Sequence, residues 1–144
     1  MDKSKQPTLH EHSAGVVLYR QMKEGREYLL LHYPGGHFDF AKGHIEGDES
    51  EQEAAYRELK EETGIENIIW IDGYKEKIEY IYRRFGELSL KDVVFFLART
   101  EQKKVTISHE HQGSVWLPYK EALQKLTFQS AKDLLSKAEK IITK

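Results

Sequence analysis

The sequence contains no cysteine. This absence excludes a disulfide framework, a thiolate zinc site and a cysteine nucleophile, and it fits a reducing compartment. No segment approaches the ~20 consecutive apolar residues that span a bilayer, and residues 1–7 lack the apolar stretch of a secretory signal. We therefore expect a soluble, cytoplasmic protein without a membrane partner.

An excess of charge of one sign is also missing. The 22 Lys and Arg residues and the 24 Asp and Glu residues give a net charge of −2, so we expect no nucleic-acid partner. Hydrophobic residues occupy 39% of the 144 positions, which is enough for one packed core. We expect a single domain over residues 1–144, monomeric or weakly dimeric, in which residues 1–10 form a flexible N-terminal segment.

Runs rich in β-branched and aromatic residues predict the strands. Residues 13–19 and 27–33 are predicted to form a hairpin, and residues 67–82 and 88–99 are predicted to form two longer strands around a turn. A further short strand is expected at residues 115–117. The glycine-containing segment between residues 34 and 49 predicts loops with one or two short strands.

Helix signals follow the glycine-containing segment and recur at the end of the chain. Ser50 and Glu53 match a capping box and Gly64 is placed for a C-terminal cap, which predicts a helix over residues 50–63. A short helix is expected after Pro118, and a C-terminal amphipathic helix is expected to dock on the sheet. The apolar stripe of that last helix consists of Ala131, Leu134, Leu135, Ala138, Ile141 and Ile142. The pattern predicts an α/β or α+β fold with a mixed sheet between helices.

Acidic residues are concentrated around the first helix. Eight acidic and two basic side chains lie between residues 46 and 62, a local excess of six negative charges. At about 100° per residue, Glu58, Glu61 and Glu62 project from one helix face. Such a cluster is either a solvated helix face or a divalent-cation site, since Mg²⁺ and Mn²⁺ prefer carboxylate oxygens and bridge them to substrate phosphates.

The spacing of these residues resembles the Nudix box, G-x5-E-x7-R-E-U-x-E-E-x-G-U, where U is aliphatic. Gly43, Glu49 and the run Arg57-Glu58-Leu59-Lys60-Glu61-Glu62-Thr63-Gly64-Ile65 match every fixed position. The resemblance implies a mixed sheet between helices. It also implies a hydrolase that splits a nucleoside diphosphate linked to another moiety, with Mg²⁺ as the cofactor and Mn²⁺ as the alternative ion.

The same resemblance implies roles for the box residues. Glu58 and Glu62 would be the main metal ligands, Glu61 would share the site, and the carbonyl of Gly43 could complete it. Arg57 would orient a catalytic carboxylate and would itself pair with Glu49. Clustered carboxylates with divalent ions suit phosphoryl transfer to water, because that reaction needs charge neutralisation and alignment more than covalent help.

Three further segments resemble the asymmetric diadenosine tetraphosphate hydrolases within this family. Residues 37–44 are similar to H-W-x-x-P-K-G-H, with Ala41 in place of the proline, and the match implies that His37 and Lys42 contact substrate phosphate. Residues 91–98 are similar to K-x-V-x-Y-W-L-A, in which Lys91 reaches the polyphosphate; Tyr82 is a further candidate for substrate binding. In Ser108-His109-Glu110-His111, Glu110 would be a remote carboxylate, either as a metal ligand or as the base that deprotonates water.

One departure and several rival functions stay open. Ser114 stands where that group has a tyrosine that stacks on adenine, so another aromatic residue would have to stack: Tyr80, Tyr82, Phe85 or Phe128. The substrate could instead be an RNA 5′-triphosphate, an oxidised nucleoside triphosphate, ADP-ribose or a diphosphoinositol polyphosphate. A protein of another class, a non-catalytic nucleotide sensor, is disfavoured because a sensor does not need every acidic ligand.

Overall fold

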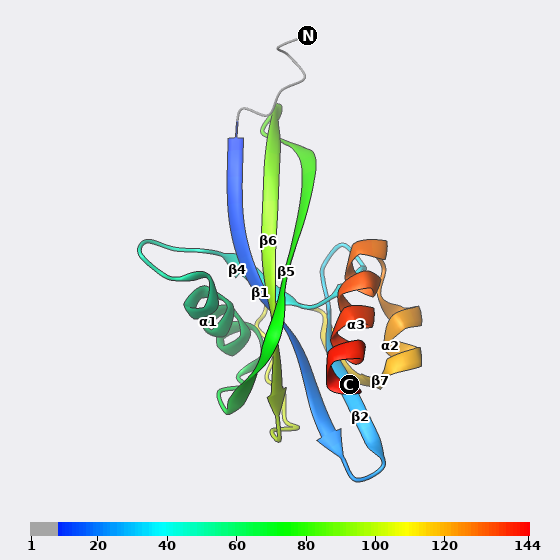
Figure 1. Cartoon of the computed structure of the whole chain (residues 1–144). Helices are drawn as coiled ribbons and strands as arrows, with labels where there is room; N and C mark the ends of the chain where they lie inside the picture. Colours follow the sequence, from blue (N-terminus) through cyan, green and yellow to red (C-terminus); the bar gives the residue numbers. More distant parts are fainter. Residues whose placement is uncertain (1–8) are drawn as a thin grey trace.

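The computed structural model describes residues 9–144 as seven strands and three helices (Figure 1). The elements are β1 (Leu9–Met22), β2 (Gly25–His32), β3 (Phe38–Asp39), β4 (Ala41–His44), α1 (Glu51–Thr63), β5 (Ile68–Arg84), β6 (Glu87–Thr100), β7 (Gly113–Pro118), α2 (Tyr119–Lys125) and α3 (Gln129–Ile142). The predicted hairpin, the two short strands between residues 34 and 49, and all three helices are confirmed.

The strands form one mixed sheet with the order β3-β2-β1-β6-β5. β1 and β6 are parallel, whereas β4 pairs with β1 and β7 pairs with β2 in antiparallel fashion. In Figure 1, α1 lies on one side of the sheet and α2 and α3 lie on the other. This mixed sheet between helices confirms the predicted fold class.

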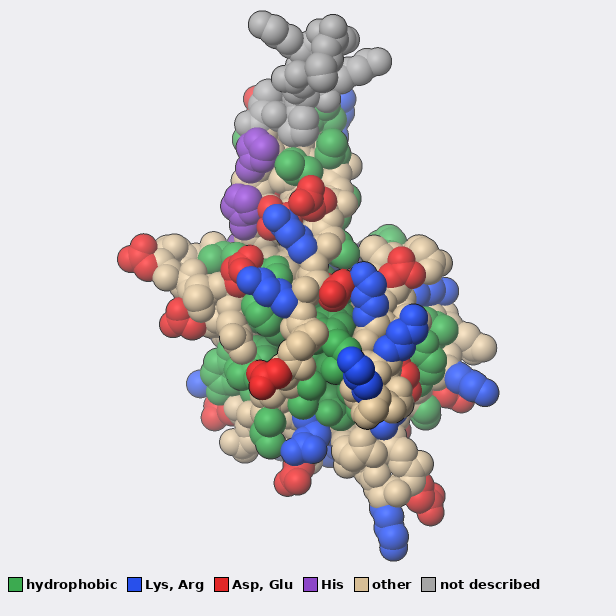
Figure 2. Space-filling model, viewed as in Figure 1, with side chains coloured by type: hydrophobic (Ala, Val, Ile, Leu, Met, Phe, Trp, Pro, Cys, Tyr) green, Lys and Arg blue, Asp and Glu red, His purple; other side chains and the backbone are tan. Residues whose placement is uncertain are grey.

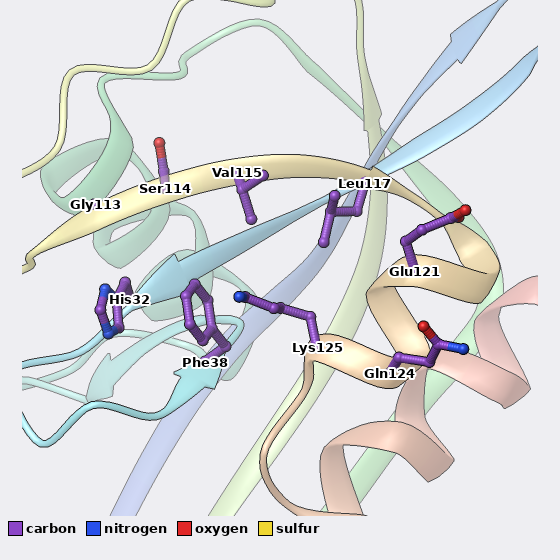
Figure 3. A pocket seen from close by; sticks show the side chains of 9 residues that line it. All are labelled: His32, Phe38, Gly113, Ser114, Val115, Leu117, Glu121, Gln124 and Lys125. Atoms are coloured by element: carbon purple, nitrogen blue, oxygen red, sulfur yellow. The ribbon is translucent and has the colours of Figure 1, made fainter.

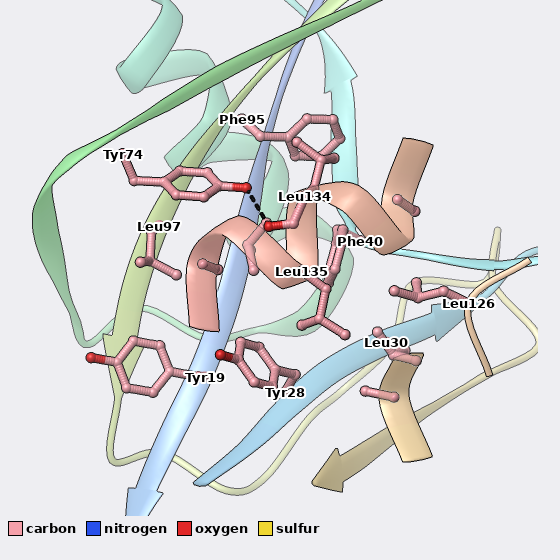
Figure 4. Packing of buried hydrophobic residues seen from close by; sticks show 14 of the residues in the cluster. Tyr19, Tyr28, Leu30, Phe40, Tyr74, Phe95, Leu97, Leu126, Leu134 and Leu135 are labelled. Carbon is pink, nitrogen blue, oxygen red and sulfur yellow. Dashed lines mark hydrogen bonds between the residues drawn. The ribbon is translucent and has the colours of Figure 1, made fainter. Parts of the chain in front are cut away.

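Each face of the sheet has its own hydrophobic core. One core packs the apolar side of α1, including Ala54, Ala55 and Leu59, against β1 and β6. The other packs α3 against the opposite face, where the Tyr74 hydroxyl donates a 2.8 Å hydrogen bond to the Leu134 carbonyl (Figure 4). Both cores fix the sheet, and α1 with it, so the side chains that α1 directs towards β4 are held on a rigid support.

Local signals determine both ends of α1. Glu53 N donates to Ser50 Oγ at 3.1 Å and Ser50 N donates to Glu53 Oε1 at 2.9 Å, which is the predicted capping box. Gly64 has φ +72° and its N–H donates to the Lys60 carbonyl. A left-handed backbone favours glycine, so the helix ends where its sequence predicts.

Strand β1 is longer than its sequence predicts. β1 begins at Leu9, so Leu9 and His10 belong to a strand and the expectation of a flexible segment over residues 1–10 is wrong for these two; residues 1–8 lie outside the described part. Residues 9–12, 79–84 and 87–92 pair into a three-stranded extension that projects from the body, hereafter the arm (Figure 1). Parallel pairing between β1 and β6 extends β1, and no local pattern encodes that pairing.

Charges of both signs cover the surface. Acidic and basic side chains are interspersed over the face drawn in Figure 2, including the base of the arm. No helix among residues 9–144 combines the length and the apolar character that crossing a bilayer demands.

Candidate active site

The carboxylates of α1 meet the backbone of β4 at Gly43. A Cβ atom at position 43 would overlap the carboxyl group of Glu58, so the absence of a side chain lets helix and strand approach this closely. Glu58 and Glu62 line a hollow of about 430 Å³ together with Lys42, Gly43, His44 and Glu110. With Tyr33 and Pro34, which also line it, the hollow is built from four separate segments of the chain.

Arg57 organises one side of this hollow. Its Nε and Nη2 donate to the two carboxylate oxygens of Glu49 at 2.6 and 3.0 Å, and its Nη1 donates to Glu58 Oε1 at 2.8 Å. Hydrogen bonds from Arg57 hold the pKa of Glu49 below its usual range. A second bond from Nη2 to the His44 carbonyl ties α1 to the end of β4. The structure thus brings Arg57 together with Glu49 and Glu58, and the orienting role that the family resemblance implies for Arg57 stays a prediction.

Glu62 is a buried carboxylate with a free oxygen. Its Oε1 lies 3.2 Å from His111 Nε2, whereas its Oε2 has no hydrogen-bond partner among the described residues. Burial, together with the charge of Glu58, raises the pKa of Glu62 to about 9, and burial likewise raises the pKa of Glu58. Ionisation of two neighbouring buried carboxylates, one with an unsatisfied oxygen, is opposed by desolvation and by charge repulsion. A divalent cation bound between them would remove both costs.

The other acidic residues differ in their placement. Glu110 lines the same hollow, and its negative charge contributes to the raised pKa of Glu62. The side chain of Glu61 is 59% exposed and accepts a 3.1 Å hydrogen bond from Arg57 Nη1. Within residues 9–144, no group of three or more His, Asp or Glu side chains is placed so that it could hold a metal ion by itself. Glu58 and Glu62 contribute two largely buried carboxylates to the hollow that Glu110 also lines, and the Gly43 carbonyl stays a predicted ligand.

A second hollow, of about 460 Å³, adjoins the first at Lys42, which lines both. It contains His37, Ile78, Tyr80 and Phe128. The His37 ring stacks on Tyr33 with centroids 4.9 Å apart and meets the Phe128 ring at 5.3 Å. Flat apolar walls beside a cationic side chain suit a nucleobase that is attached to phosphate.

Lys42 supplies positive charge where the two hollows meet, and Lys91 is a second cation on the sheet that lines neither of them. Lys42 Nζ donates to Asp39 Oδ2 at 2.8 Å. Lys91 lies on β6 between Glu11 of β1 and Tyr80 of β5, and burial, reinforced by the charge of Lys42, lowers its pKa. Tyr82 lies further out on the arm, where its hydroxyl donates to the buried carboxylate of Glu11.

Ser114 lies away from the carboxylates. It is at the rim of a third hollow, where His32 stacks on Phe38 at 4.4 Å and Lys125 Nζ lies 4.6 Å from the Phe38 ring centre. In Figure 3 the Ser114 side chain points away from Val115 and Leu117. Of the candidate stacking residues, Tyr80 and Phe128 line the hollow next to Lys42, whereas Phe85 is at the tip of the arm.

Sequence reasoning missed four residues of this region. Tyr33, His44 and His111 line the carboxylate hollow, and Glu11 accepts hydrogen bonds from the arm. Burial raises the pKa of Tyr33 well above its usual value, and the charge of Glu62 adds to the effect. His44, the last residue of the 37–44 match, and His111, next to Glu110, offered a signal in the sequence; Tyr33 and Glu11 offered none and are brought to the region by the fold.

Comparisons with known proteins identify the family. The NUDIX domain model matches residues 9–138. Asymmetrical bis(5′-nucleosyl)-tetraphosphatase from Rattus norvegicus is 34% identical over 122 residues, which cover 81% of this chain and 80% of that protein; the Caenorhabditis elegans protein of that name is 34% identical over 130 residues, 87% and 91% of the two chains. The crystal structure of a C. elegans Ap4A hydrolase binary complex superposes with a TM-score of 0.81 at 32% identity and covers 92% of this chain and 98% of its own. The chain therefore belongs to the Nudix family and is a Nudix hydrolase.

Proposed function

We propose that this chain hydrolyses diadenosine tetraphosphate to ATP and AMP. The observation that carries the proposal is the junction of two hollows at Lys42: one holds carboxylates suited to a divalent cation, and the other has aromatic walls suited to a base. A nucleotide bound across Lys42 would place its phosphates at the carboxylates. The names of the relatives that match over most of their length point to the same substrate.

Different residues would bind the cation, the phosphates and the base. Glu58, Glu62 and the Gly43 carbonyl would hold Mg²⁺, which when bound neutralises phosphate charge and acidifies water. Arg57 keeps Glu58 aimed at the hollow. Lys42 and Lys91 would hold the polyphosphate. The family resemblance implies that His37 contacts phosphate, but its ring lines the aromatic hollow with Phe128, so we assign both rings to the adenine.

The chemical step is the attack of water on a phosphorus atom. The water oxygen forms a bond to phosphorus, the bridging P–O bond breaks, and the departing nucleotide keeps the bridging oxygen. The proton of the attacking water passes to a carboxylate of the hollow. Glu58, Glu62 and Glu110 each line it, and all three are proposed as candidates for this base.

A substrate panel tests the proposal. Purified protein with Mg²⁺ is incubated with diadenosine tetraphosphate, ADP-ribose, an oxidised nucleoside triphosphate and a 5′-triphosphorylated oligoribonucleotide, and the products are separated by chromatography. We expect diadenosine tetraphosphate to turn over fastest, with equal amounts of ATP and AMP, and chelation of Mg²⁺ to stop the reaction. Faster turnover of another compound would overturn the substrate assignment, and binding without turnover of any compound would favour a nucleotide sensor.

A further inference from the structure

The turn at the tip of the arm contains an aromatic residue in a conformation that disfavours it. Arg84 pairs with Glu87, which leaves Phe85 and Gly86 as a two-residue turn, and their φ angles are +51° and +77°. Turns with two positive φ angles favour Asn-Gly, and a bulky residue at the first position is strained. The Phe85 side chain is 86% exposed, so neither burial nor backbone preference accounts for a phenylalanine here.

Arg84 connects this ring to the interior of the arm. Its guanidinium carbon lies 4.9 Å from the centre of the Phe85 ring, and its Nη1 donates to Glu11 Oε1. The backbone of Arg84 is at the outer end of the arm, opposite Glu87, whereas Glu11 pairs with Lys91 near the body of the protein. The Arg84 side chain therefore extends from the tip of the arm towards Glu11, in the direction of the active site.

Glu11 holds Arg84 in that position. It is 9% exposed, and its Oε2 accepts hydrogen bonds from Ser89 Oγ at 2.6 Å and from the Tyr82 hydroxyl. Burial alone would raise the pKa of Glu11, but these hydrogen bonds and the charge of Arg84 outweigh burial and lower the pKa to about 2. An ionised, fully bonded carboxylate is a rigid anchor.

The anchor also reaches the carboxylate hollow. His44 Nε2 lies 3.3 Å from Glu11 Oε1, the same oxygen that Arg84 contacts, and His44 lines the hollow. A continuous series of contacts thus runs from His44 through Glu11 and Arg84 to the Phe85 ring. It leaves the hollow on the arm side, whereas the aromatic hollow adjoins it at Lys42.

We propose that Arg84 and Phe85 form a subsite for the second nucleoside of a dinucleoside polyphosphate. This inference rests on the proposed function and assigns the part of the substrate that extends beyond the metal site. The base would stack on the exposed Phe85 ring, and the guanidinium of Arg84 would donate to the neighbouring phosphate. Glu11 is the positioning residue for this subsite. Because a ring stacks on any base, the subsite selects the presence of a second nucleoside and not its identity.

Phe85→Asn separates binding from stability. Asparagine suits the first position of this turn, so the variant should melt at a higher temperature than the wild type. Calorimetry with Mg²⁺ measures its affinity for a methylene-bridged, non-hydrolysable analogue of diadenosine tetraphosphate and for methylene-bridged ATP. We expect a dissociation constant about tenfold higher for the dinucleotide and a change of less than about twofold for the mononucleotide. A purely structural role for Phe85 cannot give a more stable protein that binds only the dinucleotide less well.

Two arginine variants provide the matched comparison. Arg84→Gln should weaken dinucleotide binding by about tenfold, whereas Arg83→Gln should not, because Arg83 bonds the Gly86 carbonyl instead of Glu11. Unchanged dinucleotide affinity in Phe85→Asn and Arg84→Gln overturns the subsite, as does an equal loss for both ligands. Equal affinity of the wild type for the two ligands overturns it as well. These binding results do not depend on turnover, so a failure of the proposed hydrolysis is seen separately in the substrate panel.

Discussion

The space beside Gly43 is occupied by the carboxyl group of Glu58, with no room for a Cβ atom between them. A strand backbone and a helix carboxylate are thereby brought to one point. This contact explains why the Nudix spacing begins with a glycine in this chain, since any other residue would push Glu58 out of the hollow.

We expect Gly43→Ala to lower turnover by about 100-fold while the fold is retained, because a displaced carboxylate no longer holds the cation in place. Steady-state kinetics and circular dichroism measure the two quantities. Gly113→Ala is the matched control, since a Cβ at Gly113 meets no atom within 4 Å. Equal activity of Gly43→Ala and the control would show that the close approach is dispensable.

Replacement of the central carboxylates tests their chemical role. We expect Glu58→Gln and Glu62→Gln each to lower kcat by about 10²-fold or more, because an amide cannot replace an anionic ligand. Glu66→Gln, on an exposed side chain that pairs only loosely with Lys60 at 3.5 Å, should stay near wild type. Near wild-type turnover in either of the first two variants would refute the assignment.

The raised pKa of Glu62 predicts a pH-dependent stability in metal-free protein. Between about pH 4.5 and about pH 9, folded Glu62 keeps a proton that the unfolded chain has released, so the free energy of unfolding contributed by this residue falls as the pH rises. Urea unfolding in the presence of a chelator should show Glu62→Gln gaining stability relative to the wild type from pH 5 to pH 8.5. A difference that does not vary with pH would contradict this explanation.

The aromatic hollow next to Lys42 should determine nucleotide affinity. We expect Phe128→Ala to raise KM for diadenosine tetraphosphate roughly tenfold with little change in kcat, since stacking on a base contributes about 1–3 kcal/mol to binding. Ile69→Ala removes a comparably exposed apolar side chain, 56% against 45% for Phe128, outside this hollow. An unchanged KM in Phe128→Ala would place the base elsewhere.

Local patterns predicted the parts of this protein that local interactions determine. The capping box at Ser50 and the glycine at position 64 located α1, and the box spacing located Arg57, Glu58 and Glu62 on it. These signals depend on neighbouring residues, and the structure has each one as its sequence predicts.

The features that the sequence did not predict depend on pairing between strands that are far apart in the chain. Leu9 and His10 belong to β1 because β6 lies beside them in parallel. Glu11 reaches Tyr82 and Ser89 only across three strands, and Tyr33 reaches the hollow only because β2, β4 and α1 meet there. Ser114 shows the same limit, because its distance from the carboxylates depends on the pairing of β7 with β2.

The central claim is that Glu58, Glu62 and the Gly43 carbonyl hold a divalent cation for the attack of water on a nucleoside polyphosphate. The most direct measurement is an anomalous difference map from crystals grown with Mn²⁺ and the methylene-bridged dinucleotide. The account predicts a manganese peak between these three groups, in contact with the phosphate chain. Peaks confined to other carboxylates, with phosphates bound away from Glu58 and Glu62, would contradict it.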